Sequence, residues 1–182
     1  MADLSAPSLT MKRILILLLA LMPITASAQG FQIEDGKIIW QKIYATDMTI
    51  SDIHKSMVIS DAYYDITILS DCIVAKIKPF KYIPEDYGFR WGNSSVLLLN
   101  GAIGPILLRI DIKEGRYRVT ASNILVTDIT PGGLDAMGTT TRLEDVALTD
   151  GTPNKFMTSQ LAPIFDHFLN LMTAFHKADD DW

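Results

Sequence analysis

The sequence predicts an α+β fold whose elements follow the order strand, helix, four strands, helix. Three observations predict it: short runs of β-branched residues separated by turns, alternation of polar and apolar residues along the middle of the chain, and a closing segment with apolar residues at helical spacing. Antiparallel strands with one apolar face need a cover, and two amphipathic helices are available to provide it. We therefore expect an antiparallel sheet with both helices packed on one face.

The first strand and the first helix are expected in the residues that follow Asp35. The segment GKIIWQKIY, residues 36–44, has the β-branched and aromatic composition of a strand. Thr49 or Ser51 is suited to cap the helix that follows, with Asp52 in its first turn. The apolar residues that then share one helical face are Ile50, Ile53 and Met57.

The four middle strands are expected to pair as two hairpins. YDITIL and CIVAKIKPF are joined at Ser70-Asp71, and residues 106–112 and 116–126 are joined at the turn formed by Glu114 and Gly115. Alternation along the second hairpin separates two faces. The positions assigned to its apolar face are Ile106, Leu108, Ile110, Ile112, Tyr117, Val119 and Ala121, and those assigned to its polar face are Arg109, Asp111, Lys113, Arg116, Arg118, Thr120 and Ser122.

The C-terminal third is expected to hold a long polar loop and the closing helix. Residues 128–153 contain TPGG, MGTTT and TDGTP and are interpreted as a functional or mobile loop. The helix is expected over residues 154–177. Its apolar stripe consists of Phe156, Leu161, Ile164, Phe165, Phe168, Leu171, Met172 and Phe175.

The N-terminal segment indicates export. Met11-Lys12-Arg13 precedes an apolar run from Ile14 to Ile24 and the small residues of Ala26-Ser27-Ala28, the pattern of a secretory signal peptide. Residues 1–28 are therefore expected to be a leader and signal peptide with Met11 as the start, although the run is also compatible with a buried N-terminal helix. Cleavage near Ala28 would leave one α+β domain, residues 29–182, in the periplasm or outside the cell, with no transmembrane segment.

Charge and composition argue against several classes of function. The 182-residue chain carries a net charge of −5, which disfavours binding to nucleic acid. Cys72 is the only cysteine, so no internal disulfide is possible, and in a strand it is expected to be a small buried hydrophobe. No phosphate loop, metal-ligand motif or serine-hydrolase motif is present, so we expect no metal, no cofactor and no catalytic residue.

The basic residues of the polar face allow two interpretations. They form the solvated side of the sheet, with cross-strand pairs such as Asp111 with Arg116 or Arg118. Alternatively they bind an anionic ligand, in which case the candidate ligand-binding residues are Lys76, Lys78, Arg109, Arg116 and Arg118.

Two classes of function follow from these observations. The absence of a paired catalytic pattern favours a non-catalytic exported module that binds a protein, a glycan or a small ligand in the bacterial envelope. The alternative is a hydrolase-like enzyme whose site lies in the loops at 85–95 and 128–153 and uses Asp86, Arg90 or Glu144.

Three motifs resemble those of a known family. DGKIIWQKIY after the signal peptide, IKEGRYRVTASNI near the middle, and a closing helix with a Trp at its tail are similar to a family of secreted proteins from Bacteroides-type bacteria, a domain of unknown function with a TATA-binding-protein-like fold. The resemblance spans about Phe31 to Phe175. It implies the same order of strands and helices and carries no active-site residues.

Overall fold

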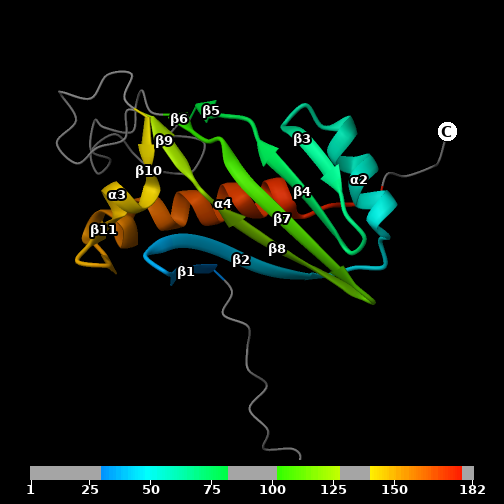
Figure 1. Ribbon diagram of the computed structural model, residues 1–182, viewed down its shortest axis with the longest axis horizontal. Coiled ribbons are helices and arrows are strands. Elements are labelled where there is room, and N and C mark those ends of the chain that lie inside the picture. Colours follow the sequence, from blue (N-terminus) through cyan, green and yellow to red (C-terminus); the bar gives the residue numbers. More distant parts are fainter. Residues whose placement is uncertain (1–29, 82–101, 128–139, 178–182) are drawn as a thin grey trace, which may run out of the picture.

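The computed structural model describes residues 30–81, 102–127 and 140–177. They form an α+β fold built on a six-stranded antiparallel sheet (Figure 1). Hydrogen-bonded neighbours follow the order β1-β2-β8-β7-β4-β3. The strands in that order are β1 (Gly30–Glu34), β2 (Lys37–Ala45), β8 (Arg116–Ser122), β7 (Ile106–Lys113), β4 (Cys72–Ile77) and β3 (Tyr63–Ile68).

Two helices cover one face of this sheet. They are α2 (Ile50–Ile59) and α4 (Ala162–Thr173), and the π-helical turn η3 (Met157–Leu161) leads into α4. Ile53 and Met57 of α2 join Phe165 and Leu169 of α4 in one core with the apolar side chains of the strands. The predicted antiparallel α+β fold with both helices on one face is thus confirmed. We call the opposite side of the sheet the outer face.

Smaller elements flank the main sheet. A second antiparallel sheet has the order β10-β9-β6-β5, and a two-stranded hairpin joins β11 to β12. These strands and the short helix beside them are β5 (Phe80–Lys81), β6 (Ala102–Ile103), β9 (Leu125–Thr127), β10 (Thr140–Arg142), α3 (Leu143–Ala147), β11 (Leu148–Thr149) and β12 (Thr152–Pro153).

The structure differs from the sequence-based expectations at β1, in the loop expected over residues 128–153 and at the end of the closing helix. The strand β1 was not predicted; it pairs with β2 across a turn at Asp35 and Gly36. The expectation of a polar loop is wrong from residue 140 onward, because Leu143 and Ala147 enter the core and order β10, α3 and the β11–β12 hairpin around them. Residues 1–28, 85–95 and 128–139 lie outside the described residues.

The closing helix also ends earlier than expected, at Thr173 rather than residue 177. The Tyr117 hydroxyl donates to the carbonyl oxygen of Thr173 at 2.7 Å and accepts from the backbone N–H of Phe175 at 3.0 Å. In a longer helix, backbone groups would pair with this carbonyl and this N–H. Because the buried Tyr117 hydroxyl pairs with both instead, the helix ends there.

Hydrogen bonds between polar side chains of β2 and α4 hold this helix on the sheet. The Trp40 indole donates to Asp166 Oδ1 at 2.9 Å, and the Tyr44 hydroxyl lies 2.8 Å from Thr173 Oγ1. Lys42 hydrogen-bonds Asn170 Oδ1 in the same row. Because Trp40 is fully buried, its N–H needs such a partner.

Candidate functional site

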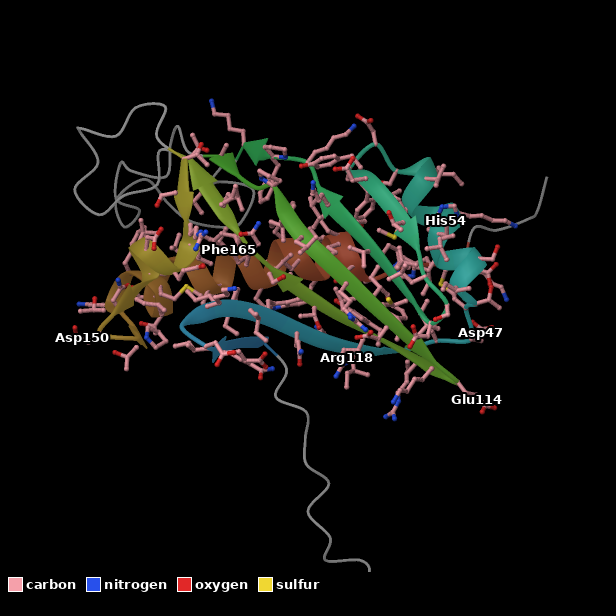
Figure 2. The ribbon with its side chains drawn as sticks, viewed as in Figure 1. Asp47, His54, Glu114, Arg118, Asp150 and Phe165 are labelled. Carbon is pink, nitrogen blue, oxygen red and sulfur yellow. The ribbon has the colours of Figure 1, made fainter. Side chains whose placement is uncertain are left out.

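The β7–β8 hairpin places its basic side chains on the outer face. Tyr117, Val119 and Ala121 are buried beneath the helices, whereas Arg116 and Arg118 are exposed, as the alternation predicts. The two-residue turn at Glu114 and Gly115 sets the register. The cross-strand pairs of the outer face are Leu107 with Ser122, Arg109 with Thr120, Asp111 with Arg118, and Lys113 with Arg116. Figure 2 shows Glu114 at the turn, at the lower right of the molecule, and Arg118 nearer its middle.

Asp111 joins two of the predicted ligand-binding arginines. Its Oδ1 lies 2.7 Å from Arg109 Nε, and its Oδ2 lies 2.9 Å from Arg118 Nη2. Of the two pairings that the sequence left open, the structure contains Asp111 with Arg118. The Asp111 side chain is only 15% exposed. Burial alone would raise the pKa of this carboxyl, but the hydrogen bonds from Arg109 and Arg118 outweigh it, so the pKa of Asp111 lies below its usual value.

The two predicted lysines are also paired, at another part of the sheet. Lys76 Nζ lies 2.8 Å from Asp65 Oδ2 and 5.5 Å from the centre of the Tyr64 ring, and Lys78 Nζ lies 2.6 Å from Asp61 Oδ1. Both ion pairs are largely exposed, so they contribute little to stability. Of the predicted ligand-binding residues, Arg116 and Arg118 lie together at the β7–β8 hairpin, and Lys76 and Lys78 lie apart from them.

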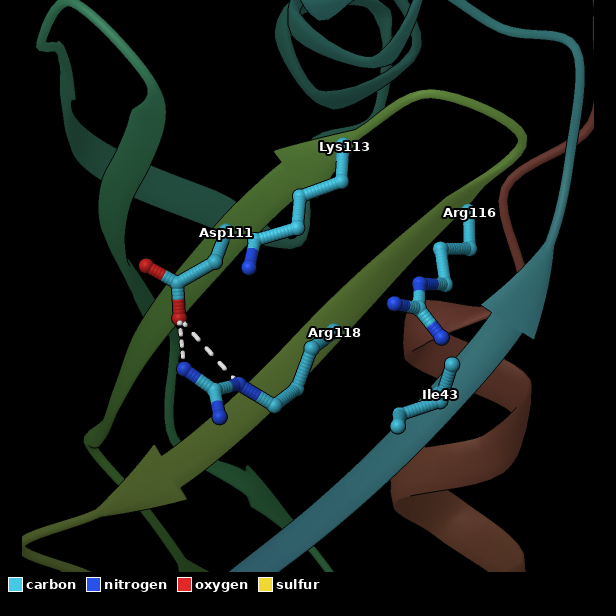
Figure 3. Close-up of a pocket in the computed structure, with 5 residues that line it drawn as sticks. All are labelled: Ile43, Asp111, Lys113, Arg116 and Arg118. Atoms are coloured by element: carbon cyan, nitrogen blue, oxygen red, sulfur yellow. Dashed lines mark hydrogen bonds and ion pairs between the residues drawn. The ribbon is translucent and has the colours of Figure 1, made fainter. Parts of the chain in front are cut away.

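A hollow of about 210 Å³ opens at the end of the hairpin. It is lined by Ile43, Asp111, Lys113, Arg116 and Arg118, whose side chains lie on the same side of the sheet (Figure 3). Lys113 and Arg116 face each other across the hairpin, and neither forms an ion pair with any described residue. The hollow thus presents two basic groups that form no ion pair with a described carboxylate.

Two residues of the hollow were not among the predicted ligand-binding residues. Lys113 was assigned to the polar face by alternation, and the turn at Gly115 was the signal that places it opposite Arg116. Ile43 comes from β2, where it lies opposite Arg118. No local pattern identifies it, because the β2–β8 pairing joins segments far apart in the sequence.

Of the three residues proposed for a hydrolase, the structure describes only Glu144. Asp86 and Arg90 lie outside the described residues. Glu144 lies in α3, at the opposite end of the molecule from the β7–β8 turn (Figures 1 and 2). Among the described residues, no three His, Cys, Asp or Glu side chains are grouped so that they could hold a metal ion. Cys72 is a buried free thiol, as predicted.

Comparison with known proteins gives two similar solved structures. No family model and no curated protein matches the chain. A TBP-like protein from Parabacteroides distasonis is 16% identical, with a TM-score of 0.49 over 78% of this chain and 90% of that one. A DUF4468 family protein from Bacteroides ovatus is also 16% identical, with a TM-score of 0.46 over 78% of this chain and 85% of that one. Both are described by fold or family alone, and they bring no ligand or activity to this chain. The family suggested by the motifs stays a prediction.

Proposed function

We propose that this protein is a non-catalytic binding module of the bacterial envelope that takes an anionic ligand on the outer face of its sheet. The observation that supports it is the hollow at the β7–β8 hairpin, where Lys113 and Arg116 form no ion pair within the described residues. The chain as a whole is acidic, with a net charge of −5, so a basic hollow is a local departure from its average charge.

The pairing of charges across the β7–β8 hairpin favours the binding of an anion over a purely stabilising role. A solvated face is stabilised by opposite charges in cross-strand pairs, whereas like charges directly opposite each other are destabilising. The Asp111–Arg118 pair follows the first pattern and the Lys113–Arg116 pair follows the second. An acidic ligand would supply the charge that the second pair needs.

The test compares wild-type protein with the double variant Arg116→Thr/Arg118→Thr. Simple carboxylates, phosphate and sulfate are added at constant ionic strength, and the urea midpoint of unfolding is recorded, since a ligand that binds only the folded state raises it. We expect at least one anion to stabilise wild type and not the variant. The matched control is Lys55→Thr/Lys155→Thr, which removes two exposed charges away from the hollow. Equal responses in wild type and both variants would refute the proposal.

The envelope location rests on the signal-peptide pattern of residues 1–28. Within the described residues no helix is long and apolar enough to cross a membrane. Mass spectrometry of intact protein secreted by a suitable host should give the mass of a chain that begins at Gln29. Recovery of the uncleaved chain in the cytosol would contradict the envelope location but not the proposed binding of an anionic ligand.

A further inference from the structure

Two basic residues of the hollow, Lys113 and Arg116, form no ion pair with any described residue. Both oxygens of Asp111 already accept hydrogen bonds, Oδ1 from Arg109 and Oδ2 from Arg118. Lys113 and Arg116 lie directly opposite each other and form the next outer-face pair, nearer to the turn than the Asp111–Arg118 pair. An acidic group seated between these two residues would offset their mutual repulsion.

The size of the hollow limits what enters it. Its volume of about 210 Å³ is below the roughly 300–1,000 Å³ of pockets that enclose a whole ligand, so it accommodates an end group and a few carbon atoms. The guanidinium of Arg116 presents a planar fork of donors that matches a carboxylate, and Lys113 adds a second positive charge. A carboxylate at the end of a ligand therefore fits the groups available.

The two sides of the hollow differ in chemistry. Across the strands β7, β8 and β2 the row of outer-face residues is Asp111, Arg118, Ile43. Ile43 is partly buried and provides an apolar wall, on which aliphatic carbons of a ligand would lose water-exposed area. On the other side, the lowered pKa of Asp111 keeps its carboxylate ionised at neutral pH. A second negative charge on the ligand would approach this carboxylate.

From this arrangement we propose that the hollow binds a single carboxylate carried on an aliphatic body, and that Asp111 selects against ligands with a second negative charge. This inference rests on the proposed function and names its class of ligand. Arg116 and Lys113 hold the carboxylate, and Ile43 contacts the carbon chain. Asp111 acts as a specificity-determining residue, since it holds Arg118 in place and repels a further anionic group.

The test uses three acids that differ by one feature each. Hexanoate and acetate share one carboxylate and differ in aliphatic length, whereas hexanoate and adipate share the carbon count and differ in charge. Each is titrated at constant ionic strength into the ¹⁵N-labelled full chain, and the amide shifts of β7 and β8 give the affinity. We expect hexanoate to bind about tenfold more tightly than acetate, the effect of burying one or two methylene groups. Adipate should bind more weakly than hexanoate.

Three variants assign these effects to residues. Ile43→Thr should reduce the preference for hexanoate over acetate, and Asp111→Asn should reduce the preference for hexanoate over adipate. Lys76→Gln is the control, because Lys76 is on the same sheet but pairs with Asp65 outside the hollow. It should leave all three affinities unchanged.

The outcomes separate this inference from the proposed function. If adipate or acetate binds as tightly as hexanoate, the proposed ligand class is wrong. The proposal of an anion site at the hairpin is then still supported. If Asp111→Asn leaves the ratio of hexanoate to adipate unchanged, Asp111 does not set the selectivity. If no anion shifts the amides of β7 and β8, the proposed function and this inference both fail.

Discussion

Arg116 and Val119 belong to one strand and differ entirely in surroundings. Val119 is fully buried in the core, whereas Arg116 is exposed and has no ion pair with a described residue. We expect Val119→Ala to destabilise the protein by about 2–4 kcal/mol, because it removes buried methyl groups and leaves a cavity. Arg116→Thr should change the free energy of unfolding by less than about 0.5 kcal/mol. Urea melts of both variants make the comparison, and equal losses would mean that Arg116 makes a contact absent from the described residues.

Tyr117 is the residue through which the sheet holds the end of α4. Burial raises the pKa of its hydroxyl to about 12, so the group stays protonated at neutral pH and can both donate and accept. Tyr117→Phe keeps the ring and removes both hydrogen bonds, leaving the Thr173 carbonyl and the Phe175 N–H without this partner. We expect a loss of about 1–3 kcal/mol and faster amide exchange at Phe175. Tyr64→Phe, on the outer face, serves as the control, and an equally small effect of both changes would contradict the argument.

The sequence predicts which face of a strand each residue of the second hairpin occupies, but it does not predict all of the contacts that these residues make. Alternation alone assigns Tyr117 to the core and Arg118 to the outer face, because a strand has only two sides. Whether Asp111 pairs with Arg116 or Arg118 depends on the register that the turn imposes. The presence of Ile43 beside Arg118 depends on a pairing between distant strands, which local patterns do not contain.

Helix α2 begins at a capping box whose two halves are visible in the structure. The Thr49 hydroxyl oxygen accepts from the backbone N–H of Asp52, and the Asp52 carboxylate accepts from the backbone N–H of Thr49 at 2.9 Å. Of the two caps that the sequence allowed, the structure therefore contains Thr49. We expect Thr49→Ala to cost about 1 kcal/mol in stability. Ser51→Ala, two residues further on, should be nearly neutral, and a larger loss for Ser51→Ala in urea melts would show that the box does not hold the helix.

Elements with strong periodicity were predicted and the short ones were not. The strands of the second hairpin and the amphipathic stripe of α4 each repeat a pattern over several residues. In contrast, α3 spans Leu143–Ala147 and buries only its two end residues, which is too little for a pattern to be recognised. The strand β1 was missed for a different reason, because it depends on pairing with β2, and a local pattern does not contain this pairing.

At the scale of the whole molecule, net charge and local charge have opposite signs. The chain carries a net charge of −5, yet the outer-face hollow is lined by three basic residues and one acidic residue. Long-range attraction depends on the total charge, whereas a small ligand responds to the groups within a Debye length of about 8 Å at physiological ionic strength. We therefore expect the molecule to bind a small acidic group better than a long polyanion.

Duplex DNA is the polyanion that tests this difference. Arg109 and Arg118 already contact Asp111, so within the described part of the hairpin only Lys113 and Arg116 are available to neutralise phosphates. Two such contacts predict a slope of about −2 for the logarithm of the binding constant against the logarithm of salt concentration. At physiological salt we expect binding no tighter than the weak non-specific level of about 10⁻⁴ M. Fluorescence anisotropy with a labelled duplex across a salt series measures both quantities. Submicromolar binding with a much steeper slope would show that further basic residues reach the duplex and that the acidic net charge does not prevent it.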